Sequence, residues 1–112
     1  MGLALFKERR MTERIKLIGL LPGRLVTVDR QQNINCRPID ISEHGLGIVS
    51  HDVMPVGQEL ELIIGDSVVI NLMVAWEKDD FSKQDMKRYG LVATNENINL
   101  LDIFAKNKCI TT

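Results

Sequence analysis

The 112-residue sequence lacks most of the features that would place it outside ordinary small domains. It has two cysteines, Cys36 and Cys109, so a metal site made of CxxC pairs is excluded. No apolar run approaches the roughly 20 residues that span a bilayer, and residues 1–6 are too short for the apolar part of a signal peptide. We therefore expect one cytoplasmic domain without membrane insertion.

Aromatic residues and net charge are also scarce. Aromatics make up 4% of the chain, which supplies few stacking platforms for single-stranded nucleic acid. The formal net charge is −1, whereas proteins that bind nucleic-acid polymers usually carry a basic excess. The charge is uneven, because residues 7–16 hold five basic and two acidic side chains and the remainder is acidic. This local positive segment suits a small anion better than a nucleic-acid polymer.

Hydrophobic alternation predicts six short strands separated by turn residues. The clearest pair is a hairpin in which Leu60, Leu62 and Ile64 share one face and Gly65-Asp66 forms a two-residue turn. Trp76 continues the apolar face of its strand, so we expect it in the core or at its rim, where it could also lie near a ligand. The six strands are typical of a small antiparallel barrel or sandwich. They are predicted at residues 24–30, 36–42, 46–50, 59–64, 68–76 and 88–94.

A short helix is predicted after the last strand. Its apolar residues recur at spacings of three and four, and an asparagine at position 95, 97 or 99 can cap its first turn. Because amphipathic helices usually pack on their own core, we expect it to cover the sheet rather than bind a partner. The apolar residues are Leu100, Leu101, Ile103 and Phe104.

The first group of residues that could bind a ligand is Arg10-Met-Thr-Glu-Arg14, preceded by Arg9. Positions four apart share a face in a helix and also in an extended chain, so Arg10 and Arg14 point the same way under either backbone. Two guanidinium groups on one face can hold phosphate oxygens or the O6 and N7 edge of guanine. The alternative is a solvated charge run, because exposed ion pairs with Glu8 and Glu13 are common and weak.

The second constellation is Asp40-Ile-Ser42-Glu-His-Gly45. Asp40 and Ser42 are predicted on the outward face of their strand, where a carboxylate can accept the N1 and N2 donors of guanine. Gly45 is expected in a turn that needs positive φ and an uncovered backbone. The alternative is an ordinary turn of Asp, Ser and Gly. A catalytic triad with His44 is rejected, because Ser42 rather than the histidine stands in the middle.

The order of these two motifs resembles the PilZ domain family, and Tyr89-Gly90-Leu91 near the end extends the resemblance over residues 8–107. The resemblance implies an all-β, six-stranded antiparallel PilZ-like β-barrel with a short C-terminal α-helix. It also implies a flexible basic N-terminal arm over residues 1–16, with the barrel and helix over residues 17–112. The sequence departs from the family at His44, where many members carry a second glycine.

The resemblance also implies a bacterial receptor for cyclic di-GMP that is not an enzyme and needs no cofactor. Arg10 and Arg14 would hold guanine and phosphate, Asp40 and Ser42 would hold a guanine, and Gly45 would let the backbone approach. Arg9 would favour a stacked pair of ligand molecules. Ordering of the arm would then change the surface offered to an effector protein, in motility, adhesion or biofilm control.

Two other functions remain possible on the sequence. The first is a PilZ-type adaptor that binds no ligand and acts through protein contacts. The second is a small-barrel nucleic-acid-binding protein, which the acidic body and the scarce aromatics disfavour.

Overall fold

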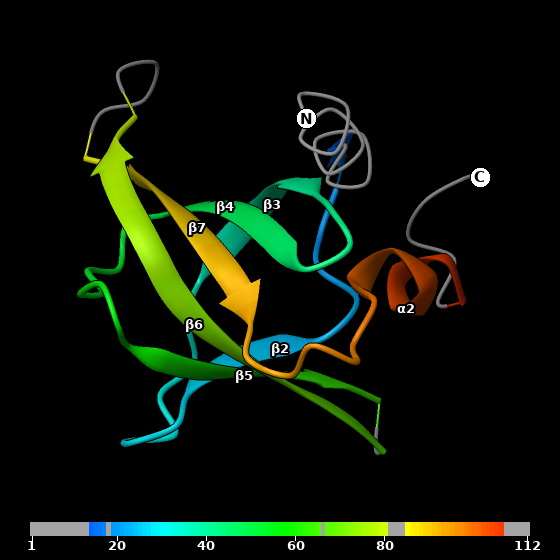
Figure 1. Ribbon diagram of the computed structural model, residues 1–112. Coiled ribbons are helices and arrows are strands. Elements are labelled where there is room, and N and C mark those ends of the chain that lie inside the picture. Colours follow the sequence, from blue (N-terminus) through cyan, green and yellow to red (C-terminus); the bar gives the residue numbers. More distant parts are fainter. Residues whose placement is uncertain (1–13, 18, 66, 81–84, 107–112) are drawn as a thin grey trace, which may run out of the picture.

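The computed structural model describes residues 14–17, 19–65, 67–80 and 85–106. Seven strands form one antiparallel sheet in the order β1-β3-β4-β7-β6-β5-β2, so the fold is all-β. Figure 1 shows the sheet as strongly curved, with a short helix at its side. The elements are β1 (Ile15–Lys16), β2 (Arg24–Thr27), β3 (Cys36–Ile41), β4 (Gly45–Ser50), β5 (Glu59–Ile64), β6 (Val68–Asp79), β7 (Lys87–Ala93) and α2 (Leu100–Lys106).

The sheet is not closed into a barrel, which corrects the six-stranded barrel predicted from the sequence. β1 and β2 are the two edges of the sheet and do not pair with each other. The outer side of β2 bonds instead to the chain that leads into β3. Ile34 N donates to Leu25 O over 2.8 Å, and Thr27 N donates to Gln32 O over 2.9 Å. These backbone groups are therefore satisfied without a strand ladder to β1.

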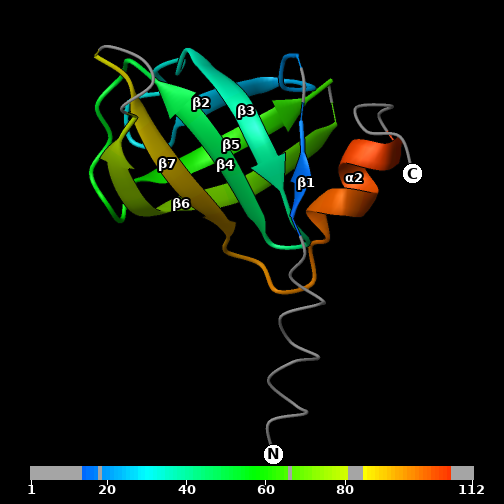
Figure 2. The same cartoon turned by 90° about the horizontal axis from the view of Figure 1, so that it is seen from above.

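The additional strand, β1, lies in the segment predicted as an arm. Ile15 pairs with Ile41 and Lys16 with Asp40, which fixes the chain along the edge of β3. Figure 2 shows β1 between β3 and α2. Residues 14–16 are therefore attached to the sheet next to the second sequence motif.

The core lies on one face of the sheet. Ile41, Leu46, Leu91 and Val74 are register neighbours on four adjacent strands, and all are buried. The alternation that predicted the strands is confirmed, since 36–42, 46–50, 59–64 and 88–94 match the observed strands to within one residue at each end.

The predicted C-terminal helix is confirmed as α2. Asn99 is its cap, because its side-chain oxygen accepts a hydrogen bond from Asp102 N over 3.2 Å. Leu100 and Phe104 are buried in the core cluster, as expected for a helix that packs on its own sheet.

Two β-bulges shift the alternation of side chains. One lies between Pro38 and Asp40, so Pro38 is buried while Ile39, predicted in the core, is only half-buried. The other lies between Val74 and Trp76. Trp76 consequently faces outward and is 44% exposed, which corrects its predicted place on the core face.

Tyr89 ties the loop after β4 to β7. Its hydroxyl donates to Asp52 O over 2.8 Å and accepts from Met54 N over 3.2 Å, and its side chain is fully buried. Tyr89→Phe is expected to lower the free energy of unfolding by about 1.5 kcal/mol, because it leaves buried polar groups without a partner. Urea denaturation measures the loss. The exposed Val56→Ala is the control and should change stability by less than about 0.5 kcal/mol. Equal stability of both variants would contradict the prediction.

Candidate functional site

The turn between β3 and β4 is closed by the second sequence motif. Ser42 N donates to Gly45 O over 2.9 Å, and Gly45 N donates to the Ser42 hydroxyl over 3.1 Å. Ser42 is almost fully buried, so its hydroxyl serves first to fix this turn. The turn holds Ser42 next to Asp40, the last outward-facing residue of β3.

Arg14 joins this turn from the other sequence motif. Its Nη2 donates to Asp40 Oδ1 over 2.8 Å, and its Nη1 donates to the Ser42 hydroxyl over 3.4 Å. The pairing of β1 with β3 explains the meeting, because the register of Ile15 with Ile41, continued by one residue, brings Arg14 opposite Ser42. The side chains of Arg14 and Asp40 are 42% and 28% exposed, so solvent and a ligand can reach both. An ion pair of this exposure contributes only about 0–1 kcal/mol to stability.

Two glycines of β4 form the floor beneath these side chains. A Cβ at Gly45 would lie 3.1 Å from Ser42 Oγ and 3.2 Å from Arg14 Nη1. A Cβ at Gly47 would collide with Asp40 Oδ1. Neither glycine has a positive φ, so the prediction of positive φ at Gly45 is wrong. A side chain at Gly47 would therefore force the Asp40 carboxylate to move, and one at Gly45 would press against Ser42 and Arg14.

The same outward row continues across two more strands. Asp40 is the register partner of Gly47, Gly47 of Gly90, and Gly90 of Trp76. A Cβ at Gly90 would collide with the indole of Trp76, so the ring lies over the glycine. Neighbouring strands of a sheet are about 5 Å apart. The Asp40 carboxylate, over Gly47, and the Trp76 indole, over Gly90, therefore form one strip of the outer surface, and both glycines are buried beneath it.

His44 occupies the centre of the turn without straining it. Its φ is not positive, so its backbone has no need of glycine. Its ring Nδ1 lies 3.0 Å from Ile98 O, and its own carbonyl accepts from Ala93 N over 2.8 Å. Glu43 O accepts from Leu100 N over 2.7 Å. The turn is thus bonded to the segment that leads into α2.

The structure therefore brings together four of the residues selected from the sequence: Arg14, Asp40, Ser42 and Gly45. Arg9 and Arg10 lie outside the described residues. The sequence did not indicate Gly47 and Gly90 as site residues. For Trp76 it did not decide between the core and a place at its rim near a ligand. The available signal was the Gly-x-Gly spacing at positions 45 and 47, which puts both glycines on one face of a strand.

Other reactive groups lie away from this site. Burial, followed by the charge of Asp52, raises the pKa of the Cys36 thiol to about 11. The thiol is therefore protonated at neutral pH and is a poor nucleophile. Within the described residues, no three histidine, cysteine or carboxylate side chains gather in a possible metal site. The same part of the chain has no helix long and apolar enough to cross a membrane.

Comparison of the chain with models of protein families, with curated proteins and with solved structures finds no match.

Proposed function

We propose that this protein is a PilZ-type receptor for cyclic di-GMP. The observation that carries the proposal is the meeting of Arg14 with Asp40 and Ser42. These residues come from two motifs that are 26 to 28 positions apart, yet they form one partly exposed group on the outer face of the sheet. The two motifs are also those on which the resemblance to the PilZ family rests.

The exposed groups suit recognition of guanine and phosphate. A guanidinium carries five N–H donors, and Arg14 uses two of them in these contacts, which leaves donors for a phosphate or for the O6 and N7 edge of guanine. Asp40 binds Arg14 through Oδ1, so Oδ2 can accept from the N1 and N2 donors of a guanine.

The strip that carries Asp40 and Trp76 suits a flat ring. Gly47 and Gly90 leave no Cβ on this part of the outer face, and Trp76 borders it with a half-exposed indole. A purine on the strip can therefore stack on the exposed face of the indole. This places an aromatic contact about one strand spacing from the Asp40 carboxylate.

The proposed switch uses the segment that precedes β1. Arg14 leads directly into β1, and Arg9 and Arg10 lie four and five positions before it. We propose that the ligand draws these arginines to the outer face, with Arg9 favouring a stacked pair of ligand molecules. The new surface would then be read by an effector protein. The assignment of this open sheet to the PilZ type, and the boundary between an arm of residues 1–16 and a body of residues 17–112, belong to this proposal.

A receptor is favoured over an enzyme by the contacts of Ser42. Among the described residues its hydroxyl contacts Gly45 and Arg14, and neither supplies a general base. The site accordingly offers binding groups without an activated nucleophile.

Isothermal titration calorimetry with cyclic di-GMP at physiological salt tests the proposal, with GTP as the competing ligand. We expect selective binding of cyclic di-GMP, and a ratio near two ligands per chain would support the stacked pair. Asp40→Asn keeps the shape of the side chain but removes its charge, and we expect at least tenfold weaker binding. If the folded protein releases no binding heat with cyclic di-GMP, the proposal is overturned. The alternative of an adaptor that binds no ligand and acts through protein contacts is then favoured.

A further inference from the structure

A row of cations lies next to this site on the outer face of the sheet. Arg37 is the register partner of Val49, Val49 of Arg88, and Arg88 of Lys78. On β4, β7 and β6 this row is two residues along from Gly47, Gly90 and Trp76, so its side chains share their face. Two residues of a strand span roughly 6.7 Å, which places the row directly beside the strip.

Among the described residues, no carboxylate forms an ion pair with any of these three cations, Arg37, Arg88 and Lys78. Lys87, on the other face of β7, shows the contrast, since it lies 3.7 Å from Glu77 and 3.4 Å from Asp79. The chain as a whole has a net charge of −1, so three unpaired cations in one row are a local feature.

The burial of Val49 and one cation–π contact indicate that these side chains lie against the sheet. Val49 stands between the two arginines on the outer face, yet it is only 6% exposed. Such burial is expected where the aliphatic stems of long flanking side chains lie over a residue. Lys78 Nζ lies 5.2 Å from the centre of the Trp76 ring, which is a cation–π contact. The cationic row therefore reaches the border of the strip.

We propose that Arg37, Arg88 and Lys78 form a second anion-binding element, which takes the phosphodiester groups of the bound dinucleotide that Arg14 does not reach. The choice of ligand rests on the proposed function. A base stacked on Trp76 displaces Lys78 from the ring and frees its ammonium for a phosphate. The two arginines supply planar donors that match phosphate oxygens.

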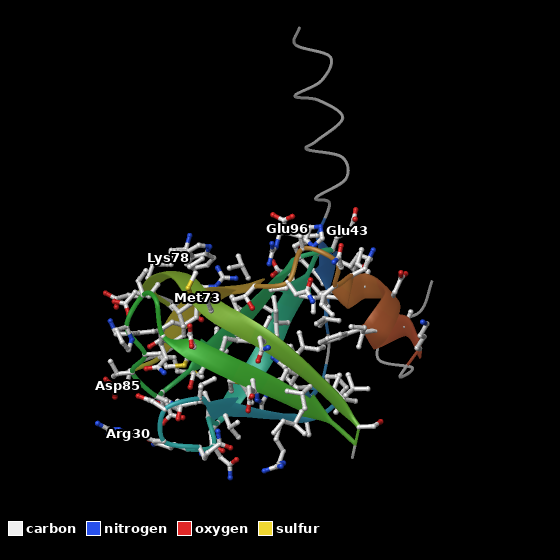
Figure 3. The ribbon with its side chains drawn as sticks, turned by 60° about the horizontal axis from the view of Figure 1, so that its bottom comes forward. Arg30, Glu43, Met73, Lys78, Asp85 and Glu96 are labelled. Carbon is white, nitrogen blue, oxygen red and sulfur yellow. The ribbon has the colours of Figure 1, made fainter. Side chains whose placement is uncertain are left out.

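The single tryptophan of the chain makes the test direct, because Trp76 fluorescence reports only on this part of the outer face. Cyclic di-GMP is titrated into the wild type, Arg37→Gln and Arg88→Gln over a range of salt concentrations. Glutamine keeps much of the stem over Val49 and removes the charge. Arg30→Gln is the matched control, because Figure 3 shows Arg30 far from Lys78 across the sheet.

We expect each row variant to raise Kd at least tenfold and to reduce the slope of log Kd against log salt by about one, as for a lost phosphate contact. Arg30→Gln should bind as the wild type does. If both row variants keep the wild-type Kd and slope while Arg14→Ala loses binding, the second element is refuted and the proposed function stands.

If the wild type does not bind cyclic di-GMP, the proposed function is refuted. The row is then tested separately with another phosphodiester. Cyclic di-AMP is then titrated at low salt. If cyclic di-AMP changes the fluorescence of the wild type but not that of Arg88→Gln, the row binds anions although the protein is not a receptor for cyclic di-GMP. No response to cyclic di-AMP would overturn the row as well.

Discussion

Arg14→Ala is expected to weaken cyclic di-GMP binding at least thirtyfold, which corresponds to about 2 kcal/mol. Arg14 is the described residue that links the two motifs, with one nitrogen on Asp40 and the other on Ser42. Its removal takes away the planar donors for the ligand and also the group that orients the Asp40 carboxylate. Calorimetric titration measures the loss.

The fold should tolerate this change. The ion pair of Arg14 is exposed, so the free energy of unfolding should fall by no more than about 1 kcal/mol in urea denaturation. Arg14→Lys keeps the charge but not the planar fork, and we expect it to bind almost as poorly as the alanine variant. Wild-type affinity in Arg14→Ala would remove this residue from the site. Wild-type affinity in Arg14→Lys alone would indicate simple charge attraction.

Gly47→Ala is expected to reduce binding by a similar factor, at least about thirtyfold, although it adds one methyl group and removes nothing. The new Cβ would collide with Asp40 Oδ1. The carboxylate must turn away, which breaks its bond to Arg14 and fills the strip beside it. Stability should change little, because the group that moves is the free end of a partly exposed side chain.

A double-mutant cycle separates this steric effect from damage to the sheet. In an Asp40→Ala background the carboxylate is absent, so Gly47→Ala should cause little further loss of affinity. The two changes should therefore be strongly non-additive. Additive losses of affinity would show that Gly47 acts through some path other than Asp40. Unchanged affinity in Gly47→Ala alone would show that the ligand does not use the strip.

Local patterns in the sequence were sufficient for most elements of the fold. Leu60 and Leu62 alternate with Glu59 and Glu61, and this alternation determines both the strand and its buried face. The cap at Asn99 depends only on residues within one turn of α2.

The hairpin between β5 and β6 was less predictable. Its last paired residues are Ile64 and Val68, so the connection is three residues long, although Gly65 predicted a turn of two. The φ of Gly65 is positive, as expected for a glycine in a tight turn. The position of the turn therefore followed from local sequence, whereas its length depended on the pairing of the two strands.

The candidate site shows the same division. The sequence by itself selected Arg14, Asp40, Ser42 and Gly45, because their residue types and spacing carry the chemistry. It could not show that β1 pairs with β3, since two residues have no periodicity to detect. That pairing alone brings Arg14 to Asp40.

Only the tertiary structure decided where Trp76 points and why Gly47 and Gly90 are glycines. A β-bulge adds one residue to one strand and is defined by the partner strand, so alternation within β6 cannot reveal it. The bulge before Trp76 turns the indole from the core face to the outer face. Glycine at positions 47 and 90 likewise leaves room for Asp40 and Trp76 from neighbouring strands. Local sequence determined the strands, while contacts between distant strands determined the surface that they present.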